Sequence, residues 1–147
     1  MKPSLSELLM GLVQELSLRV VPALNDPFVQ GSAQLWALLC LLANQEQTRA
    51  ADTRLKDIRE MRTLFGACAE LASPKLKPGL QAARAGDDHR LDLTSLDAIH
   101  AELSTLLIAL HEELEGNAGS DARKACKQIW TYLCSSAQRH ALVLPLS

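Results

Sequence analysis

The sequence predicts an all-α protein, a single-domain bundle of five to six helices that are mostly antiparallel and run up and down. Apolar residues return every three or four positions from Leu5 to Ala141, which is the period of a helix with one buried face. The 147 residues also form a chain long enough to enclose one hydrophobic core. We therefore expect one helical bundle domain over 1–147, with an apolar C-terminal tail at 141–147.

The composition argues against several classes of function. The net charge of −2 gives no electrostatic basis for binding a polyanion, and two Trp, one Tyr and two Phe are too few to stack bases. The four cysteines lie in apolar helical stretches, so we expect reduced, structural thiols. The start of the chain lacks a signal-peptide pattern, and the longest wholly apolar run, 35–43, has about half of the roughly twenty residues that a membrane helix needs. We expect a cytoplasmic protein that binds neither nucleic acid nor membrane.

The first helix is predicted from a capping box. Ser4 is followed three residues later by Glu7, so a helix should start at Leu5. Pro22 is expected to end or kink this helix. Its expected buried face consists of Leu5, Leu8, Leu9, Leu12, Leu16 and Val20.

The second helix should begin after Asp26, with Asp26 as N-cap and Pro27 at the first helical position. The run 35–43 is apolar on every side, which predicts a helix at the centre of the bundle. A continuous helix over 27–71 would be about 68 Å long, too long for a compact domain of this size. We therefore expect a break in the polar stretch 44–49.

The third helix is expected over about 51–72, ending at Ser73-Pro74. A short fourth helix, weakened at Pro78-Gly79, and a loop at 85–90 should follow. The inward stripe of the third helix is predicted to be Ile58, Met61, Phe65, Cys68 and Ala72.

The fifth and sixth helices have the clearest boundaries. Thr94 is the expected N-cap of the fifth helix, 116–119 should close it, and Ser120 should open the sixth. The tail is expected to dock on its own bundle or on a second subunit. The predicted inward stripes are Leu96, Ile99, Leu103, Leu107, Leu110 and Leu114 in the fifth helix and Ala125, Ile129 and Leu133 in the sixth.

Asp97 and His100 stand three residues apart, like one half of the carboxylate-x-x-His pattern that di-iron bundles use twice. The sequence offers no second half, and His111 lies about 16 Å further along the helix, too far to share one ion. A metal-dependent enzyme using Asp97 and His100 is therefore disfavoured, and we expect these histidines and His140 to be structural. The chain also has no nucleophile elbow and no glycine-rich phosphate loop, and we expect no cofactor.

Basic residues gather in 49–62, and Arg54 shares a helix side with Ile58. An arginine at the edge of an apolar groove could hold a carboxylate or a phosphate with its planar fork. Arg54, Arg59 and Arg62 are therefore the candidate ligand-binding residues. The alternative is a solvated face on which the arginines pair with Asp52, Asp57 or Glu60.

The segments 3–9 (PSLSELL) and 20–24 (VVPAL) resemble the start of a family of small bacterial helical proteins of unknown function. Members of that family tend to be encoded beside aminoglycoside-phosphotransferase-like kinases and acyl-CoA dehydrogenases. The resemblance covers about the first 25 residues. It implies an accessory role near acyl-CoA metabolism, without catalytic residues that could be transferred to this chain.

Surplus apolar surface and the lack of active-site patterns favour a non-catalytic interaction or accessory protein. We expect it to associate as a homodimer through an apolar helix face or the tail, and a different protein partner would suit the same surface. The alternative is a small-ligand-binding bundle with an apolar cavity, in which Arg54 or Arg62 fixes an anionic head group such as an acyl-CoA phosphate.

Overall fold

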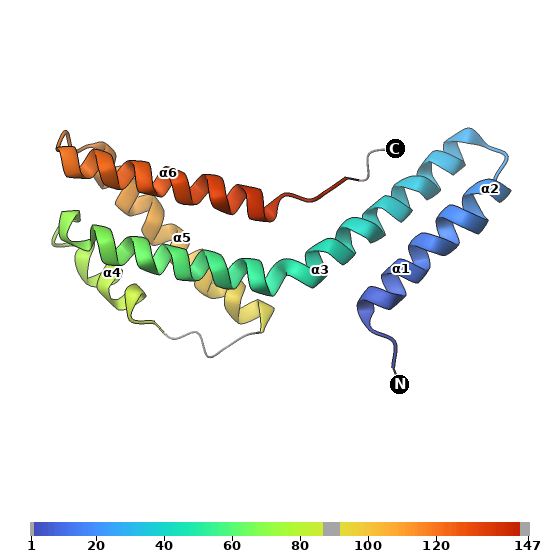
Figure 1. Ribbon diagram of the computed structural model, residues 1–147, viewed down its shortest axis with the longest axis horizontal. Helices are drawn as coiled ribbons and strands as arrows, with labels where there is room; N and C mark the ends of the chain where they lie inside the picture. Colours follow the sequence, from blue (N-terminus) through green and yellow to red (C-terminus); the bar gives the residue numbers. More distant parts are fainter. Residues whose placement is uncertain (1, 87–91, 145–147) are drawn as a thin grey trace. The chain divides into compact units, whose positions relative to one another are not determined.

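The computed structural model describes residues 2–86 and 92–144, and the regular elements in these ranges are helices (Figure 1). The protein is 84% helical, which confirms the predicted all-α helical bundle. Contacts divide the chain into two compact units. Among the described residues, unit 1 comprises 2–50 and 142–144, and unit 2 comprises 51–86 and 92–141. The single domain expected over 1–147 stays a prediction.

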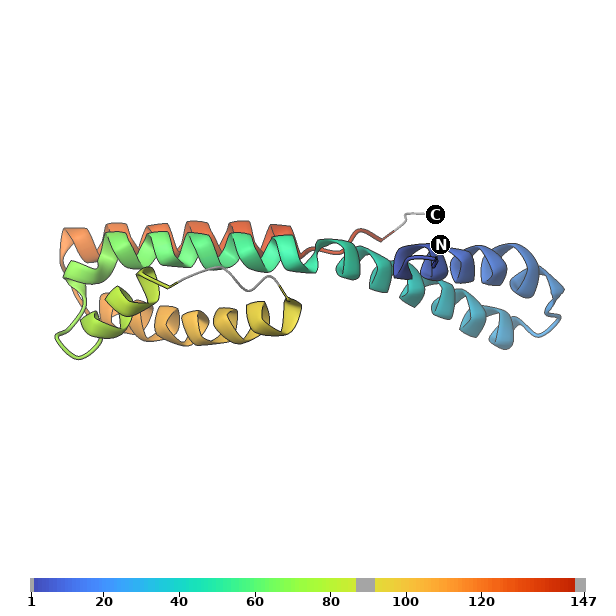
Figure 2. The same ribbon diagram turned by 90° about the horizontal axis from the view of Figure 1, so that it is seen from below.

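Unit 1 is a hairpin of two helical arms. The first arm consists of α1 (Leu5–Glu15), a π-helical turn η1 (Leu16–Val20) and α2 (Val21–Ala23), and the second is the first part of α3 (Pro27–Cys68). The two arms run beside each other in Figure 1 and Figure 2. Gln30 fastens the turn between them, because its side-chain amide donates to the carbonyl of Leu24 at 2.8 Å.

Both predicted helix starts of unit 1 are confirmed. The Glu7 amide donates to Ser4 Oγ at 3.2 Å and the Ser4 amide donates to Glu7 Oε2 at 2.6 Å, which completes the capping box. Asp26 caps α3, since its Oδ1 accepts from the Phe28 amide at 2.8 Å. Pro22 directly precedes the last residue of α2 and follows the π-helical turn, so it lies where the first arm is distorted and ends.

The predicted buried face of the first helix is wrong. No residue of α1 is buried, and Leu5, Leu8 and Leu12 are each about half exposed. The apolar arc of α1 is wider than the side that one neighbouring helix covers, so its flank remains in water. Leu9 and Leu16 of the predicted face are half-buried, and the other half-buried residues of the first arm are Ser6, Met10, Val13 and Val21.

The run 35–43 is not the buried centre that its composition predicts. Only Ala37 of this run is buried, whereas Leu35, Trp36 and Leu39 are exposed. The physical reason is the same as for α1. In unit 1 the second arm has one long helix beside it, and one neighbour cannot cover a helix that is apolar all round.

The described part of the C-terminal tail docks on α3 within unit 1. Gln45 Nε2 donates to the Val143 carbonyl at 2.8 Å, and the Val143 amide donates back to Gln45 Oε1 at 2.9 Å. One side-chain amide thus satisfies both polar groups of one backbone residue. Positions 145–147 of the expected tail lie outside the described residues.

The expected break at 44–49 is wrong, because α3 is one continuous helix of 42 residues. The stretch contains neither Gly nor Pro, and Thr48 Oγ1 bonds back to the Asn44 carbonyl at 2.9 Å. The residues of this helix are shared between the two units, because the boundary between units 1 and 2 falls inside it, after Ala50.

Unit 2 consists of residues 51–68 of α3, η2 (Ala69–Leu71), α4 (Lys77–Arg84), α5 (Leu93–Glu115) and α6 (Ser120–His140). Its three long helical segments, 51–68 of α3, α5 and α6, run along the same direction in Figure 2. The predicted stripes of the third and fifth helices are confirmed, with Ile99 and Ala72 partly buried beside them. The larger buried side chains are Ile58, Met61, Phe65, Leu80, Leu96, Leu103, Leu107, Leu110, Leu114, Ile129 and Tyr132.

Two details of unit 2 differ from expectation. The N-cap of α5 is Asp92 instead of Thr94, since Asp92 Oδ1 accepts from the Ser95 amide at 2.9 Å. In α6 Leu133 is exposed and Tyr132 is buried, because Tyr132 lies three residues after Ile129 and continues its stripe. The expected loop at 85–90 is described only at 85–86.

Among the described residues, one helix, α5, is long and apolar enough to cross a membrane by length and composition alone. This is weak evidence for a membrane span, because core helices pass the same test and one face of α5 lies in the core of unit 2.

Leu110→Ala should lower the free energy of unfolding by about 2–5 kcal/mol, because Leu110 is fully buried and its truncation leaves a cavity. Ile108→Ala, two residues away on the exposed side of α5, should change it by about 0.5 kcal/mol or less. Urea unfolding followed by circular dichroism measures both, and equal effects would contradict the assigned faces of α5.

Candidate functional site

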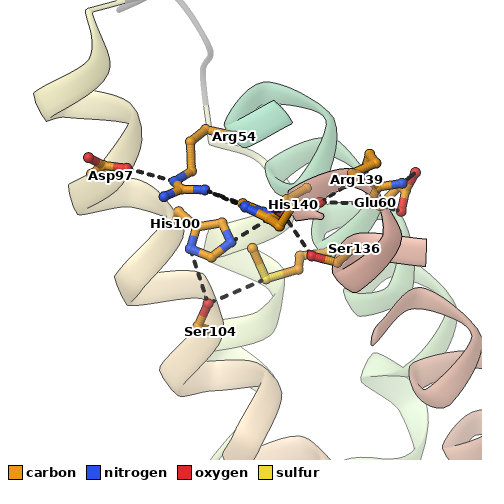
Figure 3. Close-up of polar contacts among 10 residues, drawn as sticks. Arg54, Glu60, Asp97, His100, Ser104, Ser136, Arg139 and His140 are labelled. Atoms are coloured by element: carbon orange, nitrogen blue, oxygen red, sulfur yellow. Dashed lines mark hydrogen bonds and ion pairs between the residues drawn. The ribbon is translucent and has the colours of Figure 1, made fainter. Parts of the chain in front are cut away.

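In unit 2, titratable side chains from three helices lie together around Asp57. We call this group the Asp57 cluster (Figure 3). Its members come from three helices and are Arg54, Asp57 and Glu60 of α3, Asp97 and His100 of α5, and Ser136, Arg139 and His140 of α6.

Asp57 is fully buried and its carboxylate is satisfied by the last turns of α6. Arg139 donates to Asp57 Oδ1 through Nε at 3.0 Å and through Nη2 at 2.6 Å, and Ser136 Oγ donates to Oδ2 at 3.0 Å. Arg139 also bonds both oxygens of Glu60, at 2.9 and 2.7 Å. Burial by itself raises the pKa of Asp57, but the hydrogen bonds from His140, Arg139 and Ser136 and the charge of Arg139 outweigh it and hold the pKa below its usual value.

His140 connects Asp57 to Arg54. Its Nε2 lies 2.7 Å from Asp57 Oδ2, and its Nδ1 lies 3.1 Å from Arg54 Nη1. Arg54 Nη1 also lies 3.3 Å from Nε2 of the same ring, so the guanidinium group contacts both ring nitrogens of His140. Both ring nitrogens of His140 are thereby used within the protein.

His100 approaches the same carboxylate from α5. Its Nε2 lies 3.6 Å from Asp57 Oδ2, and its Nδ1 lies 3.5 Å from Ser104 Oγ. Burial lowers the pKa of His100, and the positive charge of Arg54 acts in the same direction, while Asp57 opposes them. His100 and His140 are thus both partly buried and both have partners within the protein.

The carboxylate that pairs with Arg54 belongs to a residue of the same chain. Arg54 Nε donates to Asp97 Oδ1 at 2.7 Å. The sequence offered Asp52, Asp57 or Glu60 as intramolecular partners for the arginines of this stretch. Asp52 instead pairs with Lys56, and Asp57 and Glu60 both bond Arg139.

The structure therefore unites three of the predicted site residues, Arg54, Asp97 and His100, and separates the other two. Arg59 is exposed, and Arg62 lines a different part of unit 2. Asp97 and His100 each have a protein partner, and no three His, Cys, Asp or Glu side chains of the described residues are grouped to hold a metal ion. The ion pairs and hydrogen bonds of the Asp57 cluster join three helices, α3, α5 and α6.

Sequence reasoning considered Asp57 only as a possible partner of an arginine on a solvated face and missed its buried place at the centre of this cluster. Asp57 precedes Met61 by four residues and Cys68 by eleven, so it occupies a position on the predicted apolar stripe. A charged residue in such a position signals a buried partner. That partner, Arg139, lies 82 residues away and shows no local pattern.

Asp57→Asn should lower the free energy of unfolding by about 3 kcal/mol, because it removes one of the two carboxylates that Arg139 bonds and replaces a buried acceptor oxygen with an NH₂ group. Asp52→Asn makes the same chemical change one and a half turns earlier, where both partners of the ion pair with Lys56 are exposed, and should cost about 0.5 kcal/mol or less. Urea unfolding at pH 7 compares the two. A loss with Asp57→Asn no larger than with Asp52→Asn would show that the Asp57 cluster contributes little to the free energy of unfolding.

The lowered pKa of His100 makes stability depend on pH. In the unfolded chain His100 binds a proton near its ordinary pKa of 6.5, whereas in the folded protein it binds one only at lower pH. The free energy of unfolding should therefore fall as the pH drops from 6.5 to the pKa of His100 in the folded protein. The free energy of unfolding should fall further below pH 3.8, the ordinary pKa of Asp57, because the folded protein keeps this carboxylate ionised to a lower pH than the unfolded chain does. His100→Gln should flatten the profile between pH 7 and pH 5, as measured by urea unfolding at several pH values. Parallel profiles for the two proteins would contradict the assignment.

Comparisons of the chain with protein-family models, with curated proteins and with solved structures give no match. The resemblance of the first 25 or so residues to a family of small bacterial helical proteins stays a prediction.

Proposed function

We propose that this protein is a non-catalytic interaction protein that associates with a second copy of itself as a homodimer. An accessory role in the bacterial cytoplasm, near acyl-CoA metabolism, belongs to the same proposal and rests on the resemblance of the N-terminal segment. The observation that carries the proposal is the apolar surface of unit 1.

The hairpin exposes large apolar side chains along both arms. Phe28 is 83% exposed and Trp36 is 64% exposed. In contrast, the buried apolar residues of unit 1 are two alanines, Ala37 and Ala50, among the residues described. The other exposed members of this surface, which we call the hairpin surface, are Leu5, Leu8, Leu12, Val29, Leu35 and Leu39.

The size of the hairpin surface suits an interface. A large aromatic side chain carries about 150–250 Å², so the eight residues of the hairpin surface, which are 42% to 83% exposed, together offer several hundred Å². A stable complex of ordinary size buries about 800 Å² on each partner. Large apolar side chains exposed to water in this number favour association.

A second copy is the partner with the best chemical match. The segment 27–45 contains no charged residue, so the same surface of another copy meets it without unpaired charges. Two hairpins related by a twofold axis would place four helices around one apolar centre, as in four-helix bundles formed from two chains. In unit 2 the Asp57 cluster uses its hydrogen bonds internally, which agrees with an interaction protein.

The double variant Leu35→Gln/Leu39→Gln should shift the protein from dimer to monomer, because it places two polar side chains within the hairpin surface and disturbs no buried residue. Ile108→Gln is the matched control, since it makes the same kind of change at an exposed apolar position of unit 2 and should leave the dimer intact. Sedimentation velocity over a concentration series measures the distribution. A wild-type protein that stays monomeric at high micromolar concentration would refute the proposal, and a dimer equally stable in both variants would exclude this surface as its interface.

A further inference from the structure

The C-terminal tail brings further exposed apolar side chains to unit 1. Val143 is 65% exposed and Leu144 is 55% exposed, although the backbone of the tail is bonded to α3. Both hydrogen bonds of Gln45 go to main-chain atoms of Val143. They therefore fix the backbone of the tail, while much of its apolar side-chain surface stays in water.

Gln45 shares one side of α3 with part of the hairpin surface. Residues at intervals of three and four positions lie along one side of a helix. One such row on α3 consists of Leu35, Leu38, Leu42 and Gln45. Leu35 belongs to the hairpin surface, and the next two leucines are half-buried. The tail thus docks at the end of a row of leucines that begins within the hairpin surface.

The docked tail lacks the burial that usually accompanies an ordered apolar segment. Fixing a backbone costs conformational entropy, and hydrogen bonds exposed to water offset only part of this cost. A second copy that covers Val143 and Leu144 would add apolar burial. Neither 141–144 nor 27–45 contains a charged residue, so the same surfaces of another copy meet them without an unpaired charge.

We propose that the docked tail is part of the dimer interface, so that the second copy covers 142–144 together with the hairpin surface. Gln45 is a positioning residue, because its side-chain amide holds the tail backbone at the end of the row of leucines. This inference rests on the proposed homodimer and adds to its interface a segment that is remote from the hairpin in sequence. The affinity of the dimer then depends on Gln45, although this residue contributes no apolar side chain.

The test is sedimentation velocity of the full chain over a concentration series. Val143→Gln/Leu144→Gln should raise the dissociation constant of the dimer about tenfold or more, because it removes apolar side chains that the second copy buries. It keeps the bonds to Gln45, which involve main-chain atoms of the tail. Gln45→Ala should raise the constant several-fold, since it releases the tail. Gln47→Ala is the matched control, because it makes the same change at an exposed position on another side of α3, and it should leave the constant unchanged.

The combined variant separates the positioning role of Gln45 from a general effect on α3. If Gln45 acts through the tail, Gln45→Ala should weaken the dimer little further in a chain that already carries Val143→Gln/Leu144→Gln, whereas independent effects would multiply. Multiplied effects, or a tail variant and a Gln45→Ala variant that dimerise as well as Gln47→Ala, would overturn the inference. If Leu35→Gln/Leu39→Gln still dissociates that dimer, the hairpin interface stands without the tail. A monomeric wild-type protein would overturn both.

Discussion

The carboxylate of Asp57 is shut off from water, and its charge has to be balanced by side chains that other helices supply. Arg139, Ser136 and His140 meet it from the last turns of α6, and His100 faces it from α5. A helix that slid or rotated would leave this charge without partners, at a cost of several kcal/mol. The Leu-rich stripes of unit 2 are compatible with many helix registers, and the Asp57 cluster selects one of them.

Unit 1 has no comparable constraint. The Gln30 side chain bonds the end of the first arm, and the contact between the arms buries small residues such as Ala37 while large ones remain in water. Hydrophobic burial is the main driving force for folding, and here much of it is left unused within one chain. The two units thus differ in kind. Polar bonds join the helices of unit 2, whereas unit 1 keeps large apolar side chains exposed, and these form the surface through which we propose that two copies associate.

Periodicity was sufficient to predict the elements that pack against several neighbours. The stripe from Leu96 to Leu114 follows from spacing alone, whereas the capping box at Ser4 and the N-cap at Asp26 follow from residue types at helix starts. Periodicity does not tell how many helices surround a segment, and for that reason 35–43 is misplaced as a central helix. Nor does it give the register between helices. The pairing of Arg54 with Asp97, 43 residues apart, needs the packed structure, although Asp57 on an apolar stripe was a visible signal for the cluster.

The two-way bond between Gln45 and Val143 has a chemical consequence. The side-chain amide acts here as a donor and an acceptor at once, and both roles are needed to hold the backbone of the tail. Deamidation would convert Gln45 to glutamate and put a negatively charged oxygen opposite the Val143 carbonyl. The hydrogen bond between Gln45 and Val143, which are 98 residues apart, would then be replaced by repulsion between two oxygens. Deamidation of this one side chain would therefore weaken the contact of the C-terminal tail with α3.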